Sequence, residues 1–261
     1  PYLDGVILDR RLPRWNLFYL FNLKKLLQKY NFTHVFDLQN SRRTKFYRKF
    51  LLKYPKWSSS ENSLDKDEKL SDFNENSVLH RMEKQLKKSN VTTNSINNID
   101  LSWSIKDISR NLKQYTNGDF ILIFPFCSKK HNQKKWPYYS ELIIKIKEFY
   151  KNKYPILIAP GPGEIEEAKK LNAKIVLNDN KPVNLNFLIS LIQSAKYIIS
   201  NDTGPAHICS HLKKKGLVLF GSHTTAEKVN IGNKNFKVIS VDKLSNLKVD
   251  EIIDKIKSEL N

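Results

Sequence analysis

From Phe120 onward, short apolar runs alternate with longer segments whose apolar residues recur at helical spacing. The apolar runs cover residues 120–124, 155–159, 174–177, 197–199 and 216–220. The helical segments cover about 140–151, 164–171 and 184–195, and a further helix follows Pro205. Strands separated by helices form parallel sheets, and runs that are apolar on both faces are typical of sheets covered by helices on both sides. The sequence therefore predicts an α/β fold with a doubly wound parallel sheet.

One junction between a strand and a helix, residues 200–207, places a carboxylate and a glycine beside a predicted helix start. Pro205 suits the first helical turn, where its missing N–H leaves no hydrogen bond unmade. A helix N-terminus at the carboxyl edge of a parallel sheet favours a phosphate. Asp202 can accept hydrogen bonds from hydroxyls, so the segment indicates a nucleotide or nucleotide-sugar ligand. In the alternative interpretation, Asp202 only caps the helix and Gly204 only turns the chain.

Other loops at the same predicted sheet edge also carry polar residues. Residues 125–137 form a long basic loop, in which a lysine can neutralise a diphosphate. Residues 160–164 contain two glycines, which let the backbone approach a ligand, and Glu164, which can hold a ribose diol. In the alternative, this second loop is an ordinary turn in which Glu164 favours the start of the next helix. The loops after residues 124, 159, 177, 200 and 220 are all expected at one edge.

These segments in this order resemble glycosyltransferase family 9, the heptosyltransferases that build the lipopolysaccharide inner core. The motifs that carry the resemblance are Lys134–Pro137, Ala159–Glu164, Ala168–Leu171, Leu185–Ala195, Asn201–His207 and Leu219–Gly221. Asp4–Ile7 and Phe36–Arg43 look like pieces of the family's acceptor domain. The resemblance extends over nearly the whole chain.

The resemblance implies a GT-B fold, in which two Rossmann-like domains flank the active site and the first domain is incomplete here. It implies an inverting, metal-independent transfer of heptose from ADP-heptose to a lipopolysaccharide core acceptor, with the ADP-sugar as substrate and no cofactor. Eight positions match the family's donor-binding residues. The resemblance places Lys134 on the diphosphate, Glu164 on the ribose and Asp202 on the sugar hydroxyls. It places the backbone N–H groups of Thr203 and Gly204 on the phosphates, His207 and Ser128 in the same pocket, and Val183 near the adenine.

The start of the chain departs from the family pattern. The family opens with a strand and a Gly-Asp loop whose aspartate is the expected general base, whereas this sequence begins at Pro1 and its one methionine is Met82. The chain is therefore expected to be an N-terminally truncated fragment whose catalytic base is unknown and lies upstream of Pro1. Asp37, at the end of a predicted strand, is expected to have a structural or acceptor-binding role.

The sequence predicts two domains, an acceptor-side domain over residues 1–104 and a donor-binding domain over residues 105–261. A polar, acidic run near 58–76 is expected to be a mobile surface loop inside the first domain. A helix is predicted over about 77–88, and an amphipathic helix over 249–260. In GT-B proteins a C-terminal helix of this kind tends to pack back across the cleft.

The chain is strongly basic, with 45 Lys and Arg against 26 Asp and Glu and a formal charge of +19. Residues 1–57 alone hold thirteen Lys and Arg against three acidic residues. This excess suits anionic lipid surfaces and phosphorylated acceptors, and it also suits nucleic acid. In a third interpretation it reflects a compositional bias and has no partner. Because no nucleic-acid-binding motif is present, no nucleic acid is expected as a partner.

Two further functions stay open at this point. A GT-B relative such as a nucleotide-sugar 2-epimerase would use the same sheet edge, but it would need a catalytic acid/base pair that the sequence does not reveal. A non-catalytic basic protein would bind anionic lipid or nucleic acid and keep a vestigial donor pocket. Cys127 and Cys209 lack zinc-like spacing. His207 and His211 are four residues apart on one predicted helix face, a spacing that can bind a metal, but no glutamate follows His207, so no metal is expected. The predicted location is cytoplasmic, with peripheral contact to the inner membrane.

Overall fold

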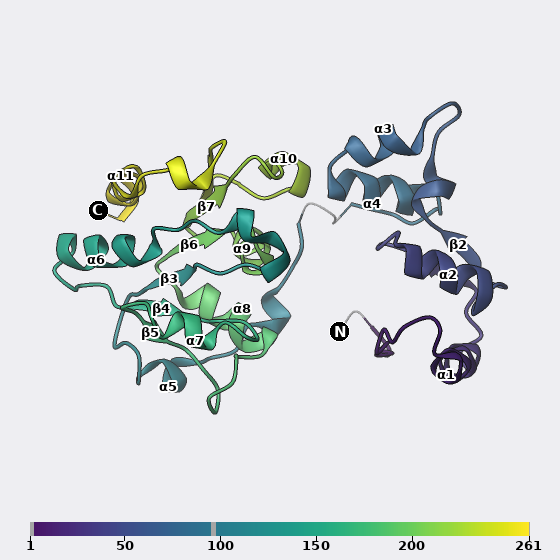
Figure 1. Ribbon diagram of the computed structural model, residues 1–261, viewed down its shortest axis with the longest axis horizontal. Coiled ribbons are helices and arrows are strands. Elements are labelled where there is room, and N and C mark those ends of the chain that lie inside the picture. The colour runs from purple at the N-terminus through teal and green to yellow at the C-terminus, as the bar shows by residue number, and fades with distance from the viewer. Residues whose placement is uncertain (1–2, 95–97, 261) are drawn as a thin grey trace. The chain divides into compact units, whose positions relative to one another are not determined.

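The computed structural model describes residues 3–94 and 98–260, which divide into two compact units, Pro1–Asn97 and Asn98–Asn261 (Figure 1). This division falls before Asn98, whereas the sequence places the domain boundary between residues 104 and 105. The short 3₁₀ helix η2 (Ser102–Ser104) belongs to the second unit, because Ser104 Oγ donates a hydrogen bond to Asn186 of a helix in that unit.

The second unit is built on a six-stranded parallel sheet with the order β5-β4-β3-β6-β7-β8. The strands are β3 (Ile121–Phe124), β4 (Ile156–Ile158), β5 (Lys174–Ile175), β6 (Tyr197–Asn201), β7 (Gly216–Phe220) and β8 (Phe236–Ser240). All five registered pairs are parallel. The predicted α/β fold with a doubly wound sheet is confirmed. The edge strand β8 was not predicted.

Alternate residues of each strand face two separate cores. On β3, Ile121 and Ile123 point into one core, and Leu122 and Phe124 point into the other. Helices α6 (Tyr139–Phe149), α7 (Ile165–Ala168) and α11 (Val249–Leu260) cover the first face. Helices α5 (Ser109–Leu112), α8 (Leu185–Ser194), α9 (Gly204–His211) and α10 (Ala226–Val229) cover the second. Burial on both faces is why β3, β4 and β7 are apolar throughout.

The predicted helices of the second unit are present with small shifts at their ends. Helix α7 is shorter than predicted and begins after its N-cap, Glu164. Helix α11 has the predicted bounds, and it packs beside α6 with Ile252, Ile253 and Ile256 in the core (Figure 1). Strand β7 begins at a glycine because a Cβ on Gly216 would stand 2.1 Å from the carbonyl oxygen of Ile198 on β6.

The first unit contains a two-stranded parallel sheet, β1 (His34–Phe36) and β2 (Lys56–Ser58), joined through α2 (Arg42–Phe50). Its other elements are α1 (Leu17–Gln28), η1 (Ser60–Ser63), α3 (Leu70–Glu75) and α4 (Val78–Lys87). A strand, a helix and a parallel strand form the repeating element of Rossmann-like domains. Leu20, Leu23 and Leu51 form its small buried cluster.

The polar run near 58–76 is not the predicted surface loop, because it contains the end of β2, η1 and α3. Ser58, Ser59, Ser60 and Ser63 are buried. The buried Gln85 side chain on α4 holds the segment, since its Nε2 donates to the carbonyl oxygens of Asp37 and Ser58, both at 3.0 Å. Serines satisfied by such contacts can be buried in spite of their polarity.

Asp37 has a structural contact in this unit. It is 6% exposed, and its Oδ1 accepts a hydrogen bond from the backbone N–H of Asn40 at 2.8 Å. This contact fixes the turn that follows β1, where Asn40 adopts a positive φ of 49°.

Across residues 3–94 and 98–260, no helix combines the length and the apolar character needed to cross a membrane.

Candidate functional site

The candidate site lies at the carboxyl ends of β3, β4 and β6. The chain runs outward from β3 to β4 and β5 and then returns beside β3 as β6, so the strand order reverses between β3 and β6. Open α/β sheets bind ligands in the crevice at such a reversal. The loops predicted to meet at one edge of the sheet do meet there.

Asn201, at the end of β6, fixes the geometry of this edge. Its buried side chain donates from Nδ2 to the carbonyl oxygen of Pro125 at 2.9 Å. Its Oδ1 accepts from the Tyr139 hydroxyl at 3.0 Å and from the Trp136 backbone N–H at 3.3 Å. Asn201 therefore ties the end of β6 to both ends of the long basic loop that follows β3.

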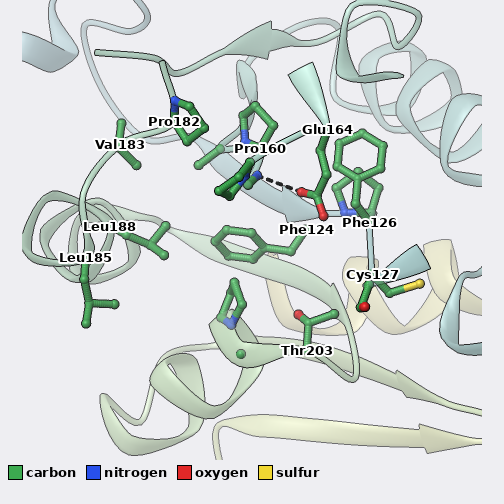
Figure 2. A pocket seen from close by; sticks show the side chains of 17 residues that line it. Phe124, Phe126, Cys127, Pro160, Glu164, Pro182, Val183, Leu185, Leu188 and Thr203 are labelled. Carbon is green, nitrogen blue, oxygen red and sulfur yellow. Dashed lines mark hydrogen bonds between the residues drawn. The ribbon is translucent and has the colours of Figure 1, made fainter. Parts of the chain in front are cut away.

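A cavity of about 660 Å³ opens at this edge, entirely within the second unit. Figure 2 shows the side chains that line it. Apolar residues form most of the lining: Phe124, Pro125, Phe126, Ala159, Pro160, Pro162, Pro182, Val183, Leu185, Leu188 and Pro205. The polar or small lining residues are Cys127, Ser128, Gly161, Glu164, Thr203 and Gly204. An apolar cavity with a few convergent polar groups is the usual form of a small-molecule site.

Glu164 brings a half-buried carboxylate into this cavity (Figure 2). Its Oε2 accepts a hydrogen bond from the Gly161 backbone N–H at 2.7 Å. A Cβ at position 161 would stand 3.1 Å from that oxygen, so a glycine leaves room for the contact. Burial raises the pKa of Glu164, and the hydrogen bond from Gly161 only partly offsets it. Its other oxygen, Oε1, accepts no hydrogen bond from the described residues.

Beside the cavity, Asp202 is the centre of a charged cluster with Lys134 and His223. Lys134 Nζ lies 2.6 Å from Asp202 Oδ2, and His223 Nε2 lies 3.0 Å from the same oxygen. The Asp202 side chain is 3% exposed, the His223 side chain 7% and the Lys134 side chain 24%. The cluster joins three loops, those after β3, β6 and β7.

The cluster holds Asp202 in its charged form. Burial opposes ionisation, but the hydrogen bonds from Lys134 and His223 outweigh it, so the pKa of Asp202 is lowered. Because the folded-state pKa lies below the unfolded value, the carboxylate stabilises the fold above about pH 4. That contribution is lost as the pH falls through the folded-state pKa. Burial lowers the pKa of His207, and the charge of Asp202 opposes this effect.

The N-terminus of α9 borders both the cavity and the cluster. Thr203 is its N-cap residue and makes no side-chain capping hydrogen bond, and Pro205 stands in the first turn. A Cβ on Gly204 would meet nothing within 4 Å, so the backbone is open to close approach there. An uncapped helix N-terminus with an open glycine fits an anionic group.

The structure divides the predicted site residues into three sets. Ser128, Glu164, Val183, Thr203 and Gly204 line the cavity. Lys134 and Asp202 do not line the cavity but pair with each other beside it. His207 lies one turn into α9, close enough to Asp202 for their charges to interact.

Sequence reasoning missed three residues that shape this edge. His223 lies in the loop after residue 220, one of the loops expected at this edge, but nothing local to it indicates a contact with Asp202. Asn201 was seen only as part of a motif, although a buried amide at a strand end is a signal of a structural hub. Phe124 was taken only as a strand residue, yet its ring also lines the cavity.

Among residues 3–94 and 98–260, no group of three or more His, Cys, Asp or Glu side chains has the arrangement of a metal site.

Comparisons with solved structures find the same fold. The Escherichia coli heptosyltransferase WaaC with ADP is 17% identical and has a TM-score of 0.62, and the match covers 95% of this chain and 79% of that one. A family 9 glycosyl transferase from Veillonella parvula is 14% identical with a TM-score of 0.68, covering 97% and 81%. The UDP-GlcNAc 2-epimerase of Methanocaldococcus jannaschii is 16% identical with a TM-score of 0.53, covering 93% and 73%.

These similarities confirm the prediction of a GT-B type α/β fold. No curated protein sequence matches the chain. The family model described as glycosyltransferase family 9 (heptosyltransferase) matches residues 20–256, which span both units. A member of that family takes a sugar from a nucleotide-sugar donor and transfers it to a glycan acceptor. The chain belongs to glycosyltransferase family 9 and is a heptosyltransferase-like glycosyltransferase.

Proposed function

We propose that this glycosyltransferase moves a heptose from ADP-heptose to a lipopolysaccharide core acceptor, with inversion of the anomeric centre and without a metal or other cofactor. The observation that carries the proposal is the adjacency of three features at one sheet edge: an apolar cavity, an uncapped helix N-terminus and a buried carboxylate paired with a lysine. Among the similar structures, one Escherichia coli heptosyltransferase is described with ADP and again with ADP-2-deoxy-2-fluoro heptose, and another is described as an ADP-heptose heptosyltransferase.

Each part of an ADP-sugar finds a matching group along this edge. The adenine would lie against Phe124, Val183 and Leu188, and Glu164 would accept hydrogen bonds from the ribose hydroxyls. The phosphates would meet the backbone N–H groups at Thr203 and Gly204, with Ser128 and His207 beside them. Lys134 would pair with the diphosphate and Asp202 with the sugar hydroxyls.

In the proposed reaction, the acceptor hydroxyl oxygen forms a bond to the anomeric carbon as the bond from that carbon to the phosphate oxygen breaks. The hydroxyl proton passes to a general base, and ADP leaves with the electron pair of the broken bond. Negative charge therefore grows on the departing phosphate. Lys134 and the N-terminus of α9 stabilise that charge, which lowers the barrier to transfer. A single displacement of this kind inverts the anomeric centre.

The acceptor is proposed to be anionic and to lie at the inner membrane surface, with the protein on the cytoplasmic side. Thirteen Lys and Arg residues against three acidic ones within residues 1–57 support this. Charge complementarity of this kind raises the rate of association with an anionic partner and weakens with salt. The Michaelis constant for a phosphorylated core acceptor should accordingly rise with ionic strength.

The first test of the proposal is a calorimetric titration of the chain with ADP, with UDP and a short single-stranded oligonucleotide as competitors at two salt concentrations. Saturable ADP binding that UDP and the oligonucleotide do not displace supports the donor assignment. Oligonucleotide binding that collapses with salt, without any ADP signal, would instead identify a nucleic-acid-binding protein with a vestigial pocket.

Replacing Glu164 with glutamine should weaken ADP binding by about 1 kcal/mol, because hydrogen bonds to a charged acceptor are stronger than those to an amide. The same substitution should have almost no effect on binding of 2′,3′-dideoxy-ADP, which lacks both ribose hydroxyls. Calorimetry with the two ligands and the two proteins forms a double-mutant cycle. Equal losses for both ligands would show that Glu164 does not contact the ribose.

Thiol labelling offers a test of where the nucleotide lies. Cys127 lines the cavity and is partly exposed, whereas Cys209 is buried, and burial raises the pKa of both thiols. A maleimide should therefore label Cys127 slowly and Cys209 hardly at all. Saturating ADP should slow labelling of Cys127 by at least about 5-fold, because a ligand in the cavity blocks access to the sulfur. Undiminished labelling, followed by mass spectrometry, would place ADP elsewhere.

A further inference from the structure

His223 faces Asp202 from the loop after β7 and has an unusual environment. Its Nε2 contacts Asp202 Oδ2, and its ring stacks on Phe220 with the ring centroids 6.1 Å apart and the planes at 9°. The side chain is 7% exposed. Its other nitrogen, Nδ1, is buried and has no hydrogen-bond partner among the described residues. The ring thus has one nitrogen fixed on a carboxylate and one with no partner.

The ammonium group of Lys134 has two anionic partners to choose between, Asp202 and the donor diphosphate. It pairs with Asp202 Oδ2 in this structure, and under the proposed function it also serves the donor diphosphate. A diphosphate at the N-terminus of α9 would compete with the carboxylate for the ammonium group. Asp202 is 3% exposed, so it would lose its charged partner without gaining water. A buried carboxylate without a cation is strongly unfavourable.

We infer that His223 is a positioning residue that replaces Lys134 as the charged partner of Asp202 when a nucleoside diphosphate takes the lysine. The inference rests on the proposed function. The ring takes one proton from solvent at Nδ1 and keeps its Nε2–H on Asp202, so the carboxylate stays ionised and oriented toward the sugar. Donor binding is then coupled to proton uptake, a coupling that a purely structural histidine would not produce.

The charged groups around the ring favour this exchange. Asp202 contacts it directly from the end of β6, Lys134 shares the Asp202 carboxylate from the loop after β3, and His207 on α9 interacts with both of those charges. Moving the lysine onto the diphosphate and adding the ligand's own charge both make the surroundings of His223 more negative. A more negative environment favours the imidazolium form.

A backbone carbonyl lies on the same side of Gly221 as the second nitrogen of the ring. A Cβ on Gly221 would be in van der Waals contact with Leu244 Cγ at 3.5 Å, with His223 Nδ1 at 3.6 Å and with the carbonyl oxygen of Gln133 at 3.8 Å. A rearrangement of the loop would let that carbonyl oxygen accept a hydrogen bond from a protonated Nδ1. Gln133 immediately precedes Lys134, so departure of the lysine and rearrangement of this carbonyl involve the same loop.

The test is calorimetric titration of the full chain with ADP at pH 7 in buffers of different ionisation enthalpy, which counts the protons taken up on binding. His223→Gln keeps a donor near the position of Nε2 but cannot titrate. We expect the parent to take up on the order of half a proton more per ADP than this variant. The difference between the two proteins removes the titration of ADP itself. His211→Gln, a half-buried histidine on α9, should leave the proton count unchanged.

Each outcome separates this inference from the proposed function. Binding of ADP with equal proton uptake in the parent and His223→Gln overturns the role of His223 and leaves the donor assignment standing. No ADP binding overturns the donor assignment. A measurement without ligand tests the exchange itself: in Lys134→Met, which removes the ammonium partner of Asp202, the NMR signals of the His223 ring at pH 7 should move toward those of an imidazolium. Ring signals identical to those of the parent in a folded Lys134→Met protein would refute the exchange.

Discussion

Replacing Asp202 with asparagine should lower kcat/KM for glycosyl transfer, measured with the general base present, by about 10²- to 10³-fold, the range for loss of one charge-stabilising group in a transition state. The substitution keeps the size of the side chain and removes its charge. Under the proposed function, it weakens the hydrogen bonds to the sugar hydroxyls as charge develops at the anomeric carbon. ADP itself should bind as tightly or more tightly, since Lys134 no longer divides its charge between carboxylate and diphosphate.

Transfer kinetics and ADP calorimetry on the same protein check both halves of this prediction. Asp119→Asn is the matched control, because Asp119 also pairs with a lysine, Lys196, but that pair is exposed. The control should change neither quantity, as expected for a surface ion pair. If Asp202→Asn weakened ADP binding and transfer by the same factor, Asp202 would serve the nucleotide and not the sugar.

The sequence predicts the sheet of the second unit well because several local signals in that part of the chain favour the same strands and helices. At residues 197–211, an apolar run, a glycine and a proline in a first helical turn all favour the same strand-to-helix junction. The structure has β6 and α9 at that place. Strand β8 lacks these signals, since Lys237 and Ser240 are exposed and the run follows no regular pattern. Only its pairing with β7 makes it a strand.

The candidate site could be predicted in part. The cavity residues lie in the loops where strands end, so the position of a strand end in the sequence is sufficient to find Glu164, Thr203 and Gly204. The contact between Asp202 and His223 joins positions 21 residues apart through the register of two strands. That register depends on β6 and β7 packing closely at Gly216, and no local pattern encodes it.

In the first unit, hydrogen bonds from one buried side chain, Gln85, order a segment whose composition is typical of a mobile loop. A run of serines and acids is typical of mobile loops, and the sequence favoured that interpretation for residues 58–76. The structure instead buries the serines around Gln85, whose amide donates to two backbone carbonyls and whose Oε1 accepts from Asn40 at 3.2 Å. A single buried amide on α4 thus binds both the turn after β1 and the end of β2. Composition alone cannot reveal this, because Gln85 lies far along the chain from the residues it holds.

Replacing Lys134 with methionine should weaken ADP binding by about 1.5–3 kcal/mol, roughly 10- to 100-fold, because the ammonium group makes a charge-assisted contact with the diphosphate. Adenosine lacks phosphates and should bind the parent and the variant equally. Lys134→Arg keeps the positive charge and should retain most of the affinity. Comparing the two ligands in calorimetry separates a phosphate contact from a general change in the cavity.

Lys135 provides the control for this prediction. It is the next residue of the same loop and has similar exposure, but its ammonium group pairs with Glu167. Lys135→Met removes the same charge from the chain and should leave ADP affinity within about twofold, since long-range effects of one exposed charge are screened by salt. Equal weakening by both substitutions would mean that the loop acts only through its total charge. A loss confined to Lys134, and absent for adenosine, requires a direct contact between that ammonium group and the diphosphate.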